Sequence, residues 1–311
     1  MPLMPMFSVV IPTFNRRDLV ARAVRSVLSQ TVDDFEIVVV DDGSTDDTAA
    51  VIRALDDSRI RLVALPHNRG PAAARNAGIA AARGQLVSFL DSDDEYLPTF
   101  LERTRAALAS TDSSIGFSWA GTQKTWTSNA DGLFREMTRR LVWNPIFSSR
   151  HDAWRYCLSH DAMWGTNNGV TIKASALAKS GTFDEAMLAC EDADLLIRLM
   201  RHFDFVVIPE CLVVVHQDAP QRVDGNPRNR ANGWARIYAK YRDDIDRDPQ
   251  ASRFFLNHVA RQFRLAGQRG KALSWVLRGL ARRPLDPVAY RATLRHITGL
   301  QRTARTAVDR P

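Results

Sequence analysis

Three acidic side chains within four residues follow a short apolar run and offer the clearest chemistry in this sequence. Asp91, Asp93 and Asp94 come directly after residues 86–90, which the apolar pattern predicts to be a buried strand. Ligands bind at the carboxyl ends of strands in open α/β sheets, so these carboxylates are expected at a binding edge. Because like charges repel, a hard divalent cation would bind here together with phosphate oxygens. The alternative is a solvated acidic turn that caps a helix starting near residue 97.

A second acidic turn follows another apolar run. Residues 35–40 are nearly all apolar and rich in β-branched side chains, as expected for a parallel strand that is covered on both faces. Asp41 and Asp42 come directly after it, and Gly43 permits a tight turn into the next helix. A carboxylate at this strand end can accept hydrogen bonds from a ribose hydroxyl or a base N–H. The alternative is an ordinary capped turn between a strand and a helix.

A third acidic group begins a helix in the second half of the chain. Glu191, Asp192 and Asp194 stand just before leucines at helical spacing, so the carboxylates are expected in the first turn of a helix. The helix dipole stabilises negative charge there, and N-terminal capping would by itself explain them. The same carboxylates are candidates for a general base that takes a proton from a reacting hydroxyl.

Strands and helices alternate through about the first 90 residues. Apolar runs at 8–11, 35–40, 60–65 and 86–90 predict four strands, and the segments between them have the composition and spacing of helices. This alternation is typical of a parallel α/β sheet with right-handed crossovers. Both of the first two acidic turns follow strands of this predicted sheet.

The last part of the chain differs in charge and in predicted structure. Residues 1–224 carry 23 Lys and Arg against 29 Asp and Glu, a net charge of −6, whereas residues 225–311 carry 19 against 6, a net charge of +13. A polar stretch at 220–227 separates the two parts. Only helices are predicted beyond it, at 231–241, 252–266, 271–281 and 287–297. An anionic membrane surface is one partner for this basic region, and a solvated helical cap is the alternative. No helix-turn-helix or aromatic RNA-binding motif supports nucleic-acid binding.

Four motifs resemble those of family 2 glycosyltransferases in order and spacing. They lie at residues 8–16, 39–46, 68–76 and 90–94, and the resemblance runs from residue 7 to about 105 and resumes at 164–217. It implies the GT-A fold, an α/β architecture with a mostly parallel sheet flanked by helices, here followed by an all-helical C-terminal appendage. The domains expected are a catalytic domain at 1–222, with a nucleotide-sugar half at about 1–105 and an acceptor half at about 106–222, and a basic helical region at 223–311.

The resemblance also assigns the donor site. The residues expected to bind a nucleotide-diphosphate sugar are Pro12, Thr13, Phe14, Asn15, Asp42, Arg75 and Asp91. Phe14 would lie beside the base, and Asp42 would hydrogen-bond the base or the ribose. Arg75 would lie near the nucleotide or the donor sugar.

A divalent metal is implied by the same resemblance. Asp93 is expected to bind it directly, and Asp91 would reach the ribose or a metal-bound water. His216, at the end of a predicted strand, would complete the shell through a ring nitrogen. Because imidazole favours transition metals, Mn²⁺ is expected in preference to Mg²⁺. A lone histidine at a strand end is otherwise an ordinary surface or core residue.

On the acceptor side, the resemblance points to Asp192 as the general base and to Glu191 as a residue that shapes the acceptor site. The sequence alone leaves Asp194 open as the base. Trp164 borders a turn rich in glycine and asparagine just ahead of this region. Its ring is the candidate that would stack on an acceptor sugar.

The sequence therefore predicts an inverting, metal-dependent glycosyltransferase. We expect a UDP-sugar donor, a hydroxyl of a glycan or lipid-linked acceptor, and a role in bacterial surface polysaccharide synthesis. The expected location is cytoplasmic, peripheral on the inner face of the membrane. A nucleotidyltransferase of similar fold is one alternative, but residues 12–17 contain none of the glycines that its phosphate loop would need. A nucleotide-sugar-binding protein without catalysis is the other, and the intact Asp91, Asp93 and Asp192 argue against it.

Overall fold

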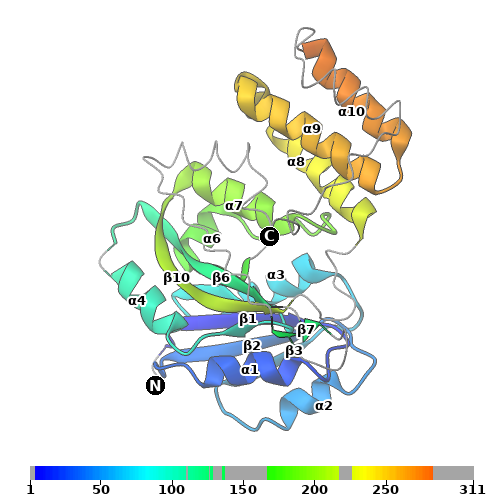
Figure 1. Ribbon diagram of the computed structural model, residues 1–311. Helices are drawn as coiled ribbons and strands as arrows, with labels where there is room; N and C mark the ends of the chain where they lie inside the picture. The colour runs from blue at the N-terminus through cyan, green and yellow to red at the C-terminus, as the bar shows by residue number, and fades with distance from the viewer. Residues whose placement is uncertain are drawn as a thin grey trace, which may run out of the picture. The chain divides into compact units, whose positions relative to one another are not determined.

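The structure is a computed structural model, and it describes residues 4–109, 111–125, 127–128, 135–136, 167–216 and 226–282. These residues form two compact units, one that ends at residue 216 and one that comprises residues 226–282. Figure 1 shows the first unit from blue to green, built around a β-sheet, and the second in yellow to orange, built from helices.

The first unit is built on a sheet whose strand order is β3-β2-β1-β4-β9-β6-β10-β5. Its N-terminal half contributes a block of parallel neighbours, β1 (Phe7–Thr13), β2 (Phe35–Asp41), β3 (Ile60–Ala64) and β4 (Leu86–Phe89). A second parallel pair is β6 (Ile115–Thr125) and β10 (Asp204–His216).

The antiparallel members are β9 (Val170–Lys173), which joins β4 to β6, and β5 (Glu95–Tyr96), which pairs with β10. A separate antiparallel pair consists of β7 (Thr127–Ser128) and β8 (Arg135–Glu136). The sheet is mostly parallel, as the sequence predicts.

Helices cover both faces of this sheet (Figure 1). Successive strand residues point to opposite faces, and in β1 Val9 packs into one hydrophobic cluster while Val10 packs into another. The first cluster joins the sheet to α1 (Val20–Leu28), α2 (Thr48–Arg53) and α4 (Phe100–Ala109). The second joins it to α3 (Pro71–Ala81), α6 (Ala174–Ser180) and α7 (Glu191–His202). Because both faces are buried, the central strands are continuous apolar runs, which makes them readable in the sequence.

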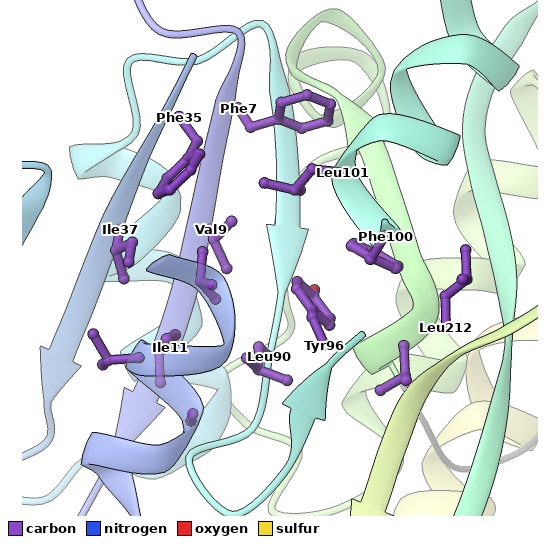
Figure 2. Packing of buried hydrophobic residues seen from close by; sticks show 14 of the residues in the cluster. Phe7, Val9, Ile11, Phe35, Ile37, Leu90, Tyr96, Phe100, Leu101 and Leu212 are labelled. Carbon is purple, nitrogen blue, oxygen red and sulfur yellow. The ribbon is translucent and has the colours of Figure 1, made fainter. Parts of the chain in front are cut away.

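The first cluster also fixes the segment that carries the acidic turn after β4. Figure 2 shows Tyr96 and Phe100 packed between the residues of β1 and Leu212 of β10. The rings of Tyr96 and Phe100 stack with their centroids 3.8 Å apart. The Tyr96 hydroxyl donates a hydrogen bond of 2.8 Å to the carbonyl of Phe89. Residues 91–94 therefore lie between two firmly anchored points, the end of β4 and the start of β5.

The second unit contains α8 (Pro227–Arg247), α9 (Pro249–Leu265) and α10 (Arg269–Arg282) in the part of the chain that the structure describes. Asn226 caps α8, since its side chain accepts a hydrogen bond of 3.0 Å from the N–H of Arg228. The helices predicted at 231–241, 252–266 and 271–281 are present and begin two to four residues earlier than expected. The helix predicted at 287–297 lies outside the described residues.

An aromatic core and a carboxylate hold this helical unit together. Trp234, Tyr238 and Phe255 are buried in it. Asp246 accepts hydrogen bonds of 2.8 Å from the Tyr238 hydroxyl and from Arg282, and so connects α8 to α10. Within the described ranges, no helix combines the length and the apolar character that a membrane crossing needs.

Candidate active site

The carboxyl ends of β1, β2 and β4 lie at one edge of the sheet. β1 is the central strand of the three, with Thr13 beside Asp41 in the register of β1 and β2. On its other side, the Leu90 N–H donates a 3.0 Å hydrogen bond to the carbonyl of Val10. The chain then continues into Asp91. The two acidic turns therefore lie at the same edge because their strands run parallel on either side of β1.

The loops after β1 and β2 hold each other through side chains. The N–H of Asn15 donates to the Ser44 hydroxyl at 2.9 Å, and the N–H of Thr45 donates to the Asn15 side-chain oxygen at 2.8 Å. Asp41 accepts a hydrogen bond of 2.9 Å from the N–H of Ser44. Asn15 therefore organises the predicted nucleotide pocket, while Phe14 is 39% exposed and has a ring surface on which a base can stack.

Asp42 anchors the start of α3. One of its carboxylate oxygens accepts a hydrogen bond of 2.8 Å from the N–H of Arg69, and the other accepts one of 2.8 Å from Gly70. Burial raises the pKa of Asp42 above its usual value, and the two N–H donors oppose that shift. In this structure both oxygens of the carboxylate bind the backbone of the loop that leads into α3. A hydrogen bond from Asp42 to a base or ribose stays a prediction.

Arg75 joins the donor-side acidic turn to the start of α7. It lies in α3 and is 6% exposed. Its Nη2 donates to Asp91 Oδ1 at 2.8 Å, and its Nη1 donates to Glu191 Oε1 at 2.6 Å. The sequence placed Arg75 and Asp91 on the donor side and Glu191 on the acceptor side. The structure brings all three into one ion-pair cluster.

The acidic turn itself is held by an asparagine that the sequence analysis did not assign. Asn168 lies in the short 3-10 helix Asn167–Gly169, which leads into β9, and is fully buried. Its side-chain oxygen accepts a hydrogen bond of 2.9 Å from the N–H of Asp91, and its side-chain amide donates to Asp94. Asp94 also accepts a hydrogen bond of 2.9 Å from the N–H of His216. Asp94 is therefore part of the scaffold of the turn. The run of two asparagines before a glycine was the only sequence signal for Asn168.

Asp93 is buried beside two arginines of the N-terminal half. It is 9% exposed, and its Oδ2 lies 4.0 Å from the guanidinium of Arg16. The backbone carbonyl of Asp93 accepts a hydrogen bond of 2.6 Å from Arg22. These contacts attach the acidic turn after β4 to the loop after β1 and to α1.

His216 lies beside Glu95 in the structure. Its Nε2 is 2.8 Å from Glu95 Oε1, and its Nδ1 is 3.2 Å from the Thr125 hydroxyl. Among the described residues, no group of three or more His, Cys, Asp and Glu side chains is arranged to hold a metal. A divalent metal that arrives with a diphosphate needs only one or two carboxylates from the protein, and Asp91 and Asp93 fit that requirement. The ring of His216 does not join them in this arrangement, and its role as a ligand stays a prediction.

Asp192 has the electrostatics of a general base. It lies half-buried in the first turn of α7 and accepts a hydrogen bond of 2.8 Å from the N–H of Ala193. Burial and the neighbouring Glu191 carboxylate raise the pKa of Asp192 to about 7, and the nearby Arg75 opposes that shift. A carboxylate with such a pKa can take a proton near neutral pH.

Asp194, the alternative base, points into a different environment. Its side chain is fully buried, and Arg198, one turn along α7, donates to Asp194 Oδ2 at 3.0 Å. Arg198 also donates to the backbone carbonyls of Ser180 and Thr182. These contacts tie Asp194 to the segment before α7, and the assignment of the base to Asp192 stays a prediction. Trp164, the predicted acceptor contact, lies outside the described residues.

A family profile matches this chain over residues 8–167, and its description is Glycosyl transferase family 2. The matched segment covers the acidic turns after β2 and β4 and reaches the residue before Asn168.

Curated bacterial proteins match this chain over alignments of different length. The succinoglycan biosynthesis protein ExoO of Rhizobium meliloti is 48% identical over 99 residues, which are 32% of this chain and 28% of ExoO. The GalNAc(5)-diNAcBac-PP-undecaprenol beta-1,3-glucosyltransferase of Campylobacter jejuni is 44% identical over 97 residues, 30% of this chain and 31% of that protein. The chain thus matches less than a third of the length of either. WcaA of Escherichia coli, named for colanic acid biosynthesis, is 25% identical over 277 residues, 84% of this chain and 90% of WcaA.

Solved structures resemble this chain in fold. S. aureus TarS 1-349 in complex with UDP-GlcNAc superposes with a TM-score of 0.62 at 18% identity, covering 95% of this chain and 93% of TarS 1-349. The mannosyltransferase PcManGT from Pyrobaculum calidifontis, in complex with GDP-Man and Mn²⁺, gives a TM-score of 0.58 at 19% identity, covering 95% of this chain and 85% of PcManGT. These similarities confirm the predicted GT-A-type fold.

Proposed function

Since this chain belongs to glycosyl transferase family 2, we propose that it is an inverting glycosyltransferase that moves a sugar from a UDP-sugar to a hydroxyl group of a glycan or lipid-linked acceptor. The observation that carries this proposal is the environment of Asp192. A carboxylate with a pKa of about 7 begins α7, and its neighbour Glu191 is tied through Arg75 to the donor-side Asp91.

The donor would bind at the carboxyl ends of β1, β2 and β4. Phe14 would stack on the base, and Pro12, Thr13, Asn15 and Asp42 would complete the nucleotide pocket. Asp91 and Asp93 would hold a divalent cation together with the diphosphate, and we propose Mn²⁺ with Mg²⁺ as the alternative. Such a cation neutralises the charge that builds on the leaving nucleoside diphosphate. The complex of PcManGT with GDP-Man and Mn²⁺ supports a divalent metal in this fold.

Asp192 would act on the opposite side of the donor sugar. Its carboxylate takes the proton of the acceptor hydroxyl while the hydroxyl oxygen attacks the anomeric carbon. The bond from that carbon to the diphosphate oxygen breaks, and the nucleoside diphosphate leaves with the bonding electron pair. Because attack and departure occur on opposite faces, the anomeric configuration inverts. Glu191, beside the base, would shape the acceptor site together with Trp164.

The names of relatives support the substrate classes and the biological setting. A glucosyltransferase named for an undecaprenol-linked acceptor is 44% identical to this chain over 97 residues, and TarS was solved with UDP-GlcNAc. ExoO and WcaA are named for the synthesis of bacterial polysaccharides. We therefore place the protein at the inner face of a bacterial membrane, as a peripheral enzyme of surface polysaccharide synthesis.

The nucleotide can be tested without knowledge of the acceptor. Thermal unfolding is measured with UDP, GDP, dTDP and CDP, each with Mn²⁺ and with EDTA. A ligand present at 100 times its dissociation constant adds about 2.7 kcal/mol of stability, so UDP with Mn²⁺ should raise Tm by several degrees. In Asp93→Ala, the part of the Tm increase that depends on Mn²⁺ should be lost. A larger shift with GDP, or equal shifts with Mn²⁺ and EDTA, would contradict the donor or the metal assignment.

Transfer is tested next with radiolabelled UDP-glucose and synthetic undecaprenyl-diphosphate-linked sugars. The product is expected in the lipid fraction, and its NMR spectrum should show an anomeric configuration opposite to that of the donor. A product that retains the donor configuration would contradict the single displacement. Nucleotide binding without any transfer to a panel of such acceptors would favour a binding protein that lacks catalysis.

A further inference from the structure

The side chain of Arg75 contacts carboxylates from two segments that are far apart in the chain. Its guanidinium donates to Asp91, which follows β4, at 2.8 Å and to Glu191, at the start of α7, at 2.6 Å. Arg75 itself belongs to α3 and is buried. A planar guanidinium can hold two carboxylates in a fixed geometry, whereas a lysine ammonium acts as a point charge.

The next residue of α3 strengthens this connection. The Asn76 side-chain oxygen accepts a hydrogen bond of 2.9 Å from the N–H of Phe183, and its amide donates one of 2.9 Å to the Phe183 carbonyl. The Phe183 ring lies 5.5 Å from the guanidinium carbon of Arg75. The segment that leads into α7 is therefore attached to α3 by two consecutive side chains.

The charges in this cluster make the connection stable. A guanidinium stays protonated in proteins, and both the Asp91 and the Glu191 carboxylates lie within hydrogen-bond distance of its nitrogens. Arg75 therefore stays charged, and the loss of either carboxylate would leave a buried cation with one partner fewer.

The orientation of the guanidinium follows its two carboxylates. Among the residues that the structure describes, no acceptor reaches Arg75 Nε, although this atom is buried. A buried N–H without an acceptor is energetically unfavourable. The guanidinium is thus oriented so that it reaches both Asp91 and Glu191, and this orientation leaves its Nε without an acceptor.

From these contacts we propose that Arg75 is a positioning residue. It holds the donor-side turn at Asp91 and the base-carrying turn at Glu191 and Asp192 at a fixed separation, so that the base faces the donor sugar correctly. This inference rests on the proposed transferase function, and it assigns Arg75 a role different from direct contact with the nucleotide. Misplacement of a base by about 1 Å can slow a reaction by about 10²-fold.

The first test separates positioning from donor binding. Arg75→Lys keeps the positive charge and removes the planar group that binds two carboxylates. Arg83→Lys is the matched control at the opposite edge of the sheet, where Arg83 contacts Glu36 at 2.9 Å. Calorimetry with UDP and Mn²⁺ gives Kd, and UDP release from UDP-glucose gives kcat and KM. We expect Arg75→Lys to lower kcat by about 10- to 100-fold and to change the Kd of UDP by less than about threefold. Weaker UDP binding with an unchanged kcat would make Arg75 a donor ligand and overturn the proposal.

The second test removes the other end of the connection. Glu191→Gln should lower kcat in the wild-type background, but it should change kcat by less than about twofold in Arg75→Lys, because both substitutions break the same link. Effects that multiply would show that the two residues act independently, and the proposal would fail. Glu191→Gln also serves as the informative variant should Arg75→Lys not fold.

The third test does not depend on the proposed reaction. Amide hydrogen exchange is measured by mass spectrometry on residues 91–96 and 183–192 without ligand. Both segments should exchange faster in Arg75→Lys and in Glu191→Gln, and neither should change in Arg83→Lys. Unchanged exchange would overturn the positioning role. A wild-type chain that neither binds nor turns over a nucleotide sugar would instead refute the proposed function, and the exchange data would still decide whether Arg75 connects the two segments.

Discussion

At the scale of single residues, the start of α7 contains two aspartates in different electrostatic environments. Asp194 is fully buried and paired with Arg198. Asp192 lies half-buried beside Glu191, and its environment raises its pKa to about 7. Burying a carboxylate next to another carboxylate disfavours its ionised form. Such an arrangement is common where a protein needs a base near neutral pH.

Asp192→Asn should abolish transfer while it preserves nucleotide binding. The amide keeps the shape of the side chain but cannot accept the proton, so kcat should fall by at least about 10²-fold. The UDP-dependent shift of Tm should stay within error of the wild type. Asp194→Asn is the comparison variant, and we expect it to lower Tm because it breaks the ion pair with Arg198. An active Asp192→Asn together with a stable but inactive Asp194→Asn would reverse the assignment.

The pH profile of the wild-type enzyme should report the same carboxylate. Asp192 must be deprotonated to act, so kcat/KM, which reports the pKa values of the free enzyme, should rise about tenfold per pH unit while the pH is below its pKa of about 7 and level off above it. Initial rates of UDP release measured across that range test this directly. A flat profile on both sides of neutral pH would show that another group takes the proton.

At the scale of elements, a buried carboxylate ties together the strand starts at the edge opposite the site. Glu36 of β2 is 2% exposed and accepts a hydrogen bond of 2.6 Å from the Ser8 hydroxyl of β1. Arg61 of β3 donates to it at 3.0 Å, and Arg83, just after α3, donates through its backbone N–H at 2.7 Å. These contacts fix the register of the parallel block whose other ends form the site.

Glu36→Gln should destabilise the protein without changing its chemistry. Burial alone would raise the pKa of Glu36, but the hydrogen bonds from Ser8 and Arg83 and the charge of Arg61 outweigh burial and hold the pKa below its usual value. Stability from this group is present above the ordinary pKa of about 4.3 and is lost as the pH falls through the lower folded value. The free energy of unfolding of the variant should be about 1.5–3 kcal/mol lower at neutral pH. It should also lack the loss of stability at acid pH that Glu36 causes in the wild type. Denaturant unfolding at several pH values measures both effects, and a change in kcat would contradict a purely structural role.

At the scale of the whole molecule, charge is divided between the two parts of the chain. The first 224 residues carry a net charge of −6, and residues 225–311 carry +13. The exposed side of α10 includes Lys271 and Arg278, two turns apart. A basic surface of this kind is attracted to anionic lipid by about 1 kcal/mol per charge, and the attraction is screened by salt.

The protein should therefore bind anionic vesicles at low salt and dissociate at high salt. Flotation with phosphatidylglycerol vesicles, compared with neutral phosphatidylcholine vesicles, measures this. The double variant Lys271→Glu and Arg278→Glu should bind less, whereas the control with Arg25→Glu and Arg53→Glu, two exposed arginines of the first unit, should bind nearly as well as the wild type. Absence of binding to anionic vesicles at low salt would make the helical unit a cap without a membrane role, and binding that is independent of salt and lipid charge would show that the basic residues do not cause it.

The sequence by itself determined the four parallel strands of the N-terminal half and the places where acidic side chains could gather. Strands such as 35–40 are recognisable because a strand covered on both faces must be apolar throughout. The turn at Asp91–Asp94 is recognisable because it follows such a strand. The helices of the C-terminal unit follow from periodicity, and their true starts differ by a few residues because caps such as Asn226 shift the first turn.

Only the tertiary structure decided which of these side chains remain available for chemistry. Asp42 holds the N–H groups of Arg69 and Gly70, and His216 lies beside Glu95. Arg75 reaches Glu191 across 116 residues of chain, and the N–H of His216 reaches Asp94 across 122. Local patterns of polarity fix where a strand or helix forms, but they carry no information on which distant carboxylate an arginine will meet. That depends on how the strands order themselves in the sheet, and it is settled only when both faces are packed.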